Sequence, residues 1–267
     1  MPSLTTEVVR THTVVVGASR GIGAAIARRF SAADHDLILT YLTHHRRLVA
    51  ASNSYAKMNR SVNLCQVDIS SSESRRSFQK VVESLAPNGI KNFILCASGG
   101  LEQGRDSRYA TRLNCDAPPE LAMLFLESIR PGGRFIYLTS HEAHFSLSSP
   151  IYGPYATIAR SKRKGESRLR KLEHLFLRRE VKLIVVSSDI VPDTITARLL
   201  ESRDPGLLAQ RIQEAGSLPE CKDVAEAVYA LCNRSVDQAG VETVYIGEPG
   251  ARYIPHSIYG EKDIADN

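Results

Sequence analysis

Hydrophobic positions along the chain fall into short, β-branched runs that alternate with longer stretches of mixed polarity. The short runs predict strands over Thr13–Val16, Leu37–Thr40, Asn63–Val67, Asn92–Cys96, Arg134–Thr139, Lys182–Ser187 and Glu242–Ile246. The stretches between them predict helices over Gly21–Ala33, Arg46–Asn59, Ser72–Leu85, Ala117–Ile129, Tyr155–Glu180 and Asp223–Cys232. Apolar strands that alternate with helices are typical of a parallel sheet covered on both faces. We therefore predict an α/β fold with a doubly wound parallel sheet of about seven strands.

The organisation of the chain predicts a single domain over residues 1–267. The sequence contains no internal repeat, low-complexity tract or linker that would divide it. One long segment, from Asp189 to Cys221, contains no strand pattern. We expect roughly residues 189–221 to form a lid over a site.

Composition narrows the class of protein. Hydrophobic residues make up 43% and charged residues 24%, the balance of a soluble globular protein with a sizeable core. The net charge of +5 could help to bind a phosphorylated ligand, but it is too small to indicate nucleic acid as a partner. Five scattered cysteines without a CxxC pair argue against a disulfide framework or a zinc site. Because no apolar run approaches the length of a membrane span, we expect a cytoplasmic protein with no membrane partner.

A glycine-rich loop, Val16-Gly17-Ala18-Ser19-Arg20-Gly21-Ile22-Gly23, directly follows the first predicted strand. Gly17 permits a tight turn, Gly21 lets the backbone approach a pyrophosphate, and Gly23 lets the next helix pack on the strand. The helix N-terminus supplies unpaired N–H groups and partial positive charge. The loop therefore predicts a dinucleotide site that also involves Ser19, Arg20 and Ile22, against the alternative of a glycine-rich turn that binds nothing.

The end of the second strand distinguishes NAD from NADP. An acidic side chain there holds a ribose 2′-hydroxyl, whereas a 2′-phosphate needs a cation. Here the position is Thr40, Arg46 and Arg47 follow closely, and Arg20 lies inside the glycine loop. This set predicts NADPH as the cofactor, although Arg46 and Arg47 could instead be solvated residues at a helix start.

With these motifs the sequence resembles the short-chain dehydrogenase/reductase family over most of its length. The resemblance implies a Rossmann fold and places Asp68 and Ile69 beside the adenine of the cofactor. The family's Asn-Ala-x-Gly motif corresponds to Cys96-Ala97-Ser98-Gly99, with Cys96 in place of Asn. Ala97, Ser98 and Gly99 are therefore implied as cofactor contacts.

The resemblance also implies further site residues. Asn114 corresponds to an asparagine in a helix behind the active site, and Ser140 to the catalytic serine. After the sixth strand, Ser188–Thr194 replaces the family's Pro-Gly-x-x-x-Thr. There the backbone of Ile190 is implied to meet the carboxamide, and Thr194 or Thr196 the pyrophosphate.

The family's Tyr-x3-Lys motif is absent, and only Tyr155 has a lysine seven residues later, Lys162. This Tyr-x6-Lys spacing is similar to that of enoyl-acyl carrier protein reductases in the same superfamily. Residues i and i+7 of a helix lie about 20° apart and roughly 10.5 Å along the axis. Tyr155 must therefore lie at or before the first turn of the helix that carries Lys162. Pro154, directly before it, is a residue typical of a helix start. We expect Lys162 to point inward with the residues on its helix face, Ile158, Glu166 and Leu169.

Hydride transfer to a carbonyl leaves an oxyanion that needs a proton and a hydrogen bond. The resemblance implies Tyr155 as proton donor, with Lys162 lowering its pKa and holding the nicotinamide ribose. Ser140 would polarise the substrate oxygen, and Asn114 would support a water chain. We predict an NADPH-dependent ketoreductase for a small or carrier-bound carbonyl compound. The family also implies a homodimer or homotetramer.

Several alternatives stay open at this stage. The enzyme could be an enoyl reductase of acyl-carrier or CoA thioesters, or the chain could be an inactive NADP-binding regulatory protein. Tyr152 could replace Tyr155 as the donor, Ser140 could cap a strand end, and Asn114 could start a helix.

No metal site is predicted. His141 and His144 lack a carboxylate or second ligand at a spacing known for metals, so we expect them to line or border the pocket.

Overall fold

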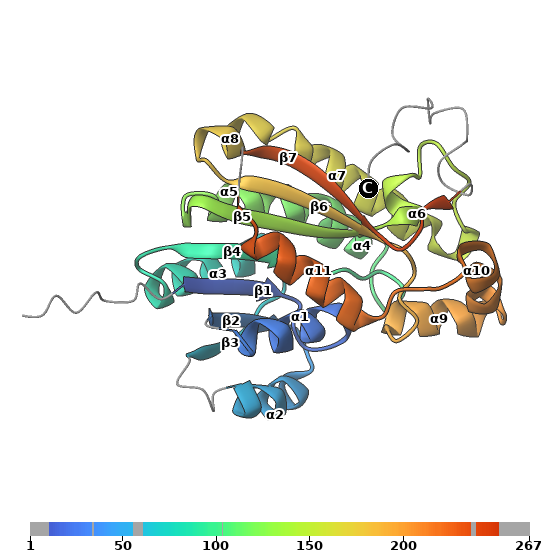
Figure 1. The fold of residues 1–267 in the computed structure, drawn as a ribbon, viewed down its shortest axis with the longest axis horizontal. Coiled ribbons are helices and arrows are strands. Elements are labelled where there is room, and N and C mark those ends of the chain that lie inside the picture. Colours follow the sequence, from blue (N-terminus) through green and yellow to red (C-terminus); the bar gives the residue numbers. More distant parts are fainter. Residues whose placement is uncertain (1–10, 34, 56–60, 103, 236–238, 251–267) are drawn as a thin grey trace, which may run out of the picture.

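The computed structural model describes residues 11–33, 35–55, 61–102, 104–235 and 239–250. Within this part of the chain, seven strands form one sheet in the order β3-β2-β1-β4-β5-β6-β7, and every neighbouring pair is parallel (Figure 1). The strands are β1 (Thr11–Val16), β2 (His35–Tyr41), β3 (Val62–Gln66), β4 (Ile90–Leu95), β5 (Ile129–Ser140), β6 (Lys182–Ser188) and β7 (Gly240–Ile246). The strand order reverses between β1 and β4, and ligands of such sheets bind outside the carboxyl ends of the strands at this point. The predicted fold class is confirmed.

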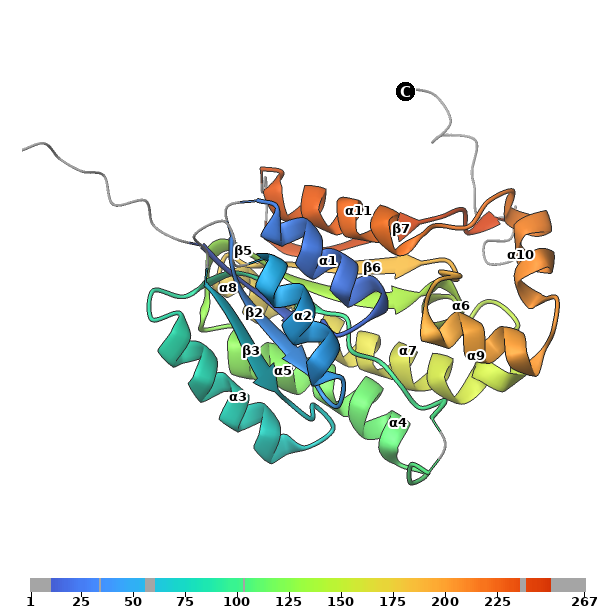
Figure 2. The same ribbon diagram turned by 90° about the horizontal axis from the view of Figure 1, so that it is seen from below.

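Helices cover both faces of the sheet (Figure 2). One layer contains α1 (Gly21–Ser31), α2 (His45–Tyr55) and α11 (Cys221–Asn233). The other contains α3 (Ser72–Leu85), α5 (Ala117–Phe125), α7 (Ala156–Arg170) and α8 (Glu173–Arg178). Short helices complete the chain: α4 (Tyr109–Thr111), the π-helix η2 (Arg112–Asp116), α6 (His141–His144), the 3-10 turn η3 (Gly153–Tyr155), α9 (Ile195–Arg203) and α10 (Leu207–Ala215).

Successive residues of each strand enter two different cores. In β1, Val14 and Val16 face the layer of α3, α5, α7 and α8, whereas Val15 faces the layer of α1 and α11. In the first core, the Phe93 and Phe135 rings stack with centroids 4.9 Å apart. Because helices cover both faces of the sheet, the middle of most strands is an apolar run, which is the pattern that identified them in the sequence.

Some element boundaries differ from the prediction. The helix predicted over Tyr155–Glu180 is two helices, α7 and α8. The helix predicted over Ala117–Ile129 ends at Phe125, because Ile129 already pairs with Ile90 as the start of β5. The last residues predicted for the second helix, 56–59, lie outside the described residues.

The segment from Asp189 to Cys221, between β6 and α11, contains helices and no strand, and all of its residues are described. It forms α9 and α10, which lie beyond the carboxyl end of the sheet in both ribbon views (Figures 1 and 2). This is the position expected of a lid over a site at that end.

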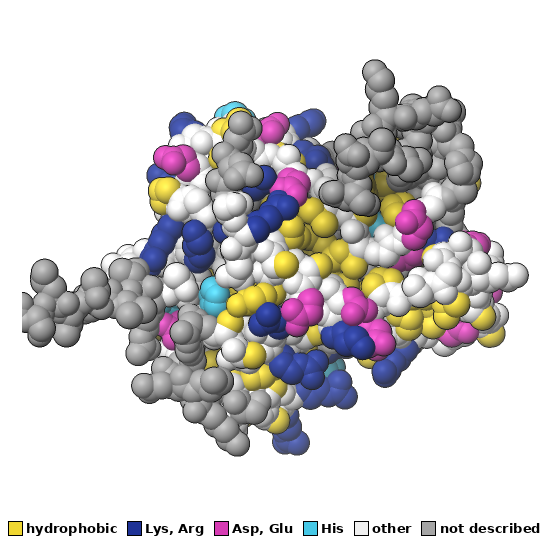
Figure 3. Space-filling model, viewed as in Figure 1, with side chains coloured by type: hydrophobic (Ala, Val, Ile, Leu, Met, Phe, Trp, Pro, Cys, Tyr) yellow, Lys and Arg dark blue, Asp and Glu magenta, His cyan; other side chains and the backbone are white. Residues whose placement is uncertain are grey.

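Charged side chains of both signs alternate on the face that carries α1 and α11 (Figure 3). Arg29 of α1, for example, pairs with Glu226 of α11 at 2.7 Å. Among the described residues, the structure contains no helix long and apolar enough to cross a membrane.

Candidate active site

A cavity of about 440 Å³ opens at the carboxyl ends of β1, β2, β4, β5 and β6, beneath α9 and α10. Nearly all residues that the sequence singled out line it. They are Gly17, Ser19, Arg20, Gly21, Ile22, Gly23, Thr40, Asp68, Ile69, Ala97, Ser98, Gly99, Ser140, Tyr155, Lys162, Ile190 and Thr194. Asn114 packs behind the cavity, Arg46 and Arg47 are exposed on α2, and His144 lies outside the lining, bonded to Glu166.

The glycine loop has the close approaches that require glycine. Gly17 has φ +88°, and a Cβ there would lie 2.9 Å from the backbone of Ala97. A Cβ on Gly23 would lie 2.1 Å from the Gly17 carbonyl oxygen. At Gly21, with φ +56°, the nearest atom to a Cβ would be the Thr194 methyl, at 3.7 Å. The loop and the start of the lid segment therefore lie side by side.

The N-terminus of α1 has the features that an anion site requires. Its N-cap, Arg20, makes no side-chain capping bond, and the first turn contains no acidic residue. The first N–H groups of this helix therefore retain their capacity to bind an anion at the cavity wall. The donor set and the glycine geometry fit the pyrophosphate of a dinucleotide.

Thr40 organises this loop from the end of β2. Its hydroxyl accepts a bond from the Gly17 N–H at 2.9 Å, and its carbonyl accepts one from the Ala18 N–H at 2.8 Å. Thr40 is only 2% exposed, so the position that would carry an acidic residue in an NAD site is neutral and buried. Arg20 is exposed and lines the same part of the cavity.

Asp68 and Ile69 follow β3 at the opposite wall. The Asp68 carboxylate accepts bonds from the N–H and the hydroxyl of Ser70, at 2.9 and 2.6 Å, so its orientation is fixed within its own turn. Ile69 is buried, at 4% exposed. The pair offers an apolar surface and an oriented carboxylate to a ligand.

Ser140 and Tyr155 meet in the same cavity. Their hydroxyl oxygens lie 3.4 Å apart. Tyr155 is the last residue of η3 and immediately precedes α7, so it lies before the first turn of the helix that carries Lys162. The Ser140 hydroxyl also accepts a bond from the Ala143 N–H and caps α6, so a capping role and a place in the site coexist. Tyr152 lines the cavity too, but the Ser140 contact goes to Tyr155.

Burial dominates the electrostatics of both side chains of the Tyr-x6-Lys pair. It raises the pKa of Tyr155 to about 12; the Ser140 hydrogen bond opposes this rise, and Glu142 adds to it. The pKa of Tyr155 is therefore raised and not lowered, and Lys162 is not among the groups that shift it. Burial also lowers the pKa of Lys162 to about 8, against the opposing influence of Glu166 and Cys96. Tyr155 is thus a protonated phenol at neutral pH, as a proton donor must be.

Asn114 lies in the π-helix η2 and is 2% exposed. Its amide donates to the Gly99 carbonyl at 2.9 Å and to the Ser161 hydroxyl at 3.1 Å. Its own carbonyl would lie 2.0 Å from a Cβ on Gly165, so α7 packs tightly on it. Asn114 therefore ties the β4 loop to the helix of Lys162 and is not a helix-starting residue.

The structure also shows a polar cluster that sequence reasoning missed. The Glu166 side chain, fully buried on α7, accepts bonds from His144 Nδ1 at 2.8 Å, Arg163 at 3.0 Å and Arg170 at 2.9 Å. His144 Nε2 lies 3.2 Å from the Tyr245 hydroxyl. The cluster joins α6, which begins after Ser140, to α7. The only signal in the sequence was that Glu166 shares a helix face with Lys162.

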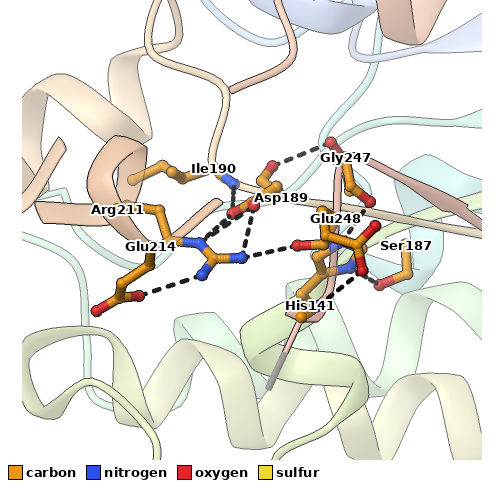
Figure 4. Close-up of polar contacts among 10 residues, drawn as sticks. His141, Ser187, Asp189, Ile190, Arg211, Glu214, Gly247 and Glu248 are labelled. Carbon is orange, nitrogen blue, oxygen red and sulfur yellow. Dashed lines mark hydrogen bonds and ion pairs between the residues drawn. The ribbon is translucent and has the colours of Figure 1, made fainter. Parts of the chain in front are cut away.

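A second buried cluster lies where the family's Pro-Gly is replaced (Figure 4). Arg211 of α10 bonds Asp189 through Nε at 3.1 Å and Nη2 at 2.8 Å, Glu214 through Nη1 at 3.1 Å and the Glu248 carbonyl through Nη2 at 2.9 Å. Asp189 also accepts the Ile190 N–H at 2.7 Å, so a carboxamide would compete with it for this donor. No spacing in the sequence indicated the Asp189–Arg211 pair.

His141 lies beside this cluster. Its Nδ1 is 2.8 Å from the Ser187 hydroxyl and its Nε2 is 3.4 Å from the Gly247 carbonyl. Burial lowers the pKa of His141 to about 4, so its imidazole is neutral at physiological pH. It lines the cavity, as expected from the sequence.

Comparisons with known proteins agree with this architecture. A family model described as Enoyl-(Acyl carrier protein) reductase matches residues 17–246. A short chain dehydrogenase from Burkholderia cenocepacia J2315, solved in complex with NADP, has a similar fold with a TM-score of 0.73 and 22% identity, covering 91% of this chain and 98% of that one. The hydroxysteroid dehydrogenase from Escherichia coli has a TM-score of 0.72 and 18% identity, covering 91% of this chain and 97% of that one. The 3-oxoacyl-[acyl-carrier protein] reductase from Brucella melitensis, solved in complex with NAD, has a TM-score of 0.72 and 17% identity, covering 89% of this chain and 96% of that one. No curated protein matches the sequence.

Proposed function

The chain belongs to the short-chain dehydrogenase/reductase family, and from this premise we propose that it is an NADPH-dependent ketoreductase for a small or carrier-bound carbonyl compound. One observation carries the proposal. The Tyr155 hydroxyl lies 3.4 Å from that of Ser140, in a cavity that Lys162 and the glycine loop also line. A bound nicotinamide cofactor supplies the hydride. The chain must supply a proton and a hydrogen bond to the substrate oxygen.

Tyr155 is proposed as the proton donor. As the carbonyl carbon gains the hydride, negative charge develops on its oxygen, and the protonated Tyr155 transfers its proton there. Ser140 holds that oxygen by a hydrogen bond. The ammonium of Lys162 stabilises the phenolate that remains, and solvent restores the proton. Replacing Tyr155 with Phe should lower kcat by about 10²–10⁴-fold and leave the Kd of NADPH within a factor of about two.

We propose NADPH rather than NADH as the cofactor from residues of β2 and the glycine loop. Neutral Thr40 and exposed Arg20 favour a 2′-phosphate over a 2′-hydroxyl held by a carboxylate. Titration of wild-type protein with NADPH and NADH, followed by nicotinamide fluorescence, should show tighter binding of NADPH. Thr40→Asp should remove that preference, whereas Thr157→Asp, on the exposed side of α7, should keep it. If neither nucleotide binds, the oxidoreductase proposal fails.

Enoyl reduction is the second candidate. The description of the matching family model and the Tyr155-x6-Lys162 spacing both favour it. In that reaction the same tyrosine would stabilise an enolate oxygen. Parallel assays with a β-ketoacyl thioester and a 2-enoyl thioester separate the two, because only one substrate should support NADPH oxidation.

We also propose a cytoplasmic homodimer or homotetramer assembled through α5 and α7. Met123 on α5 is 54% exposed and would be covered in such an interface. Light scattering of the purified protein should give a mass two or four times that of the 29.4 kDa chain.

A further inference from the structure

The lid closes the end of the cavity beside the Tyr155 hydroxyl with apolar side chains. Leu200 of α9 is 5% exposed and belongs to one hydrophobic cluster with Tyr155 and Ile158. Further apolar residues of this cluster, or packed against it, also line the cavity: Leu101, Tyr152, Ile190, Leu199 and Leu207. A substrate whose oxygen reaches Tyr155 therefore meets hydrocarbon on the surrounding walls.

The lid's buried arginine is already occupied. Arg211 lines the cavity and would be the natural partner of a substrate carboxylate. Its side chain is 5% exposed, and Asp189, Glu214 and the Glu248 carbonyl bind all three of its guanidinium nitrogens (Figure 4). Two carboxylates thus face one guanidinium, and this wall offers no net positive charge to a ligand.

The other charged side chains around the lid do not favour an anion either. Glu142 lines the cavity and lies close enough to Tyr155 to raise its pKa. Arg203 donates to the Leu101 carbonyl at 3.1 Å. Arg105 is exposed, and its guanidinium lies 4.5 Å from the centre of the Tyr109 ring, where water screens its charge.

We propose that the Asp189–Arg211 pair makes the site selective for neutral ketones with an apolar body over keto acids. The proposal rests on the ketoreductase function and names its substrate class. A carboxylate bound against the lid would lose its hydration without gaining a cation from that wall, because Arg211 is neutralised by Asp189 and Glu214. An apolar body in the same place gains from burial against Leu200 and Ile158.

Binding of a matched pair of ketones tests this proposal. The probes are 4-tert-butylcyclohexanone and 4-oxocyclohexanecarboxylate, which share the ring ketone and differ only in the substituent. Equilibrium dialysis against the protein with NADP⁺ present measures binding without turnover. We expect the neutral ketone to bind at least about tenfold more tightly, a difference of about 1.4 kcal/mol. Equal or tighter binding of the keto acid, or no binding of the neutral ketone, would overturn the proposal.

Substitutions test whether the Asp189–Arg211 pair causes the selectivity. Asp189→Asn releases part of the charge of Arg211 and should narrow the ratio of the two affinities by about fivefold or more, through tighter binding of the keto acid. Asp193→Asn is the matched control, because Asp193 is exposed in the same segment and should leave the ratio unchanged. If Asp189→Asn does not fold, Glu214→Gln removes the other carboxylate that faces Arg211 and should narrow the ratio of the two affinities too. An unchanged ratio in the variant that folds refutes the role of the pair.

The two proposals fail separately. If the neutral ketone binds but no NADPH is oxidised with it, the ketoreductase function is wrong while the selectivity stands. If NADPH is oxidised equally well with both ketones, the function stands and the selectivity is wrong.

Discussion

Replacing Lys162 with methionine tests whether this lysine is buried at the floor of the cavity. Its side chain is 7% exposed, and burial lowers its pKa to about 8 from the ordinary value of 10.5. A buried ammonium destabilises the folded state, because it loses more hydration than its surroundings replace. Methionine has a similar volume and no charge to desolvate, so Lys162→Met should stabilise the protein at neutral pH.

The magnitude and the pH window follow from the two pKa values. Their difference, 10.5 − 8 = 2.5, corresponds to about 3 kcal/mol at about 1.36 kcal/mol for each pH unit. Below pH 8 the lysine is protonated in both states, and the full penalty applies. Between pH 8 and 10.5 the unfolded state binds more protons, so the free energy of unfolding rises with pH relative to the variant. Above pH 10.5 the lysine is neutral in both states and the penalty is absent.

Urea unfolding of the wild type and Lys162→Met at about pH 7, 9 and 10.5 measures this window. The variant should be more stable by about 3 kcal/mol at pH 7, and the difference should close by pH 10.5. Lys171→Met serves as the control, because Lys171 is exposed beside the C-terminus of α7. If the free energies of unfolding of the wild type and Lys162→Met differ by the same amount from pH 7 to 10.5, Lys162 is hydrated and the reasoning from burial is wrong.

Three further predictions concern the contacts around the site. Arg211→Met should lower the free energy of unfolding by about 3–5 kcal/mol, because it leaves the buried Asp189 without its cation. Asp189→Asn should cost less, because Glu214 still pairs with Arg211, and a double-mutant cycle that finds no coupling between the two substitutions would contradict this. His144→Ala should cost about 1.5–3 kcal/mol in chemical denaturation by removing a donor to the ionised Glu166, and His144→Asn, which keeps a donor, should recover part of it. Gly23→Ala should abolish NADPH binding in a fluorescence titration, because its Cβ would overlap the Gly17 carbonyl; retained affinity would show that the loop relaxes.

The fold class, the glycine loop and the position of Tyr155 before its helix could all be predicted from the order of residues alone. These features depend on residues that are neighbours in the chain. Strands buried on both faces contain apolar runs, a turn that meets other backbone needs glycine, and Pro154 precedes the tyrosine. Helical periodicity likewise placed Lys162 on the buried face of α7, where the structure has it together with Glu166 and Leu169.

Which distant side chains meet, and how they shift one another's pKa values, depends on the assembled fold and could not be predicted from local patterns. Arg211 and Asp189 are 22 positions apart in the sequence and pair because α10 folds back over the end of β6. His144 and Glu166 form a hydrogen bond because α6 packs on α7. The pKa of Tyr155 rises where the sequence suggested a lysine would lower it, because desolvation depends on everything that surrounds the hydroxyl. Local patterns fix backbone conformation, whereas burial and charge pairing are properties of the assembled site.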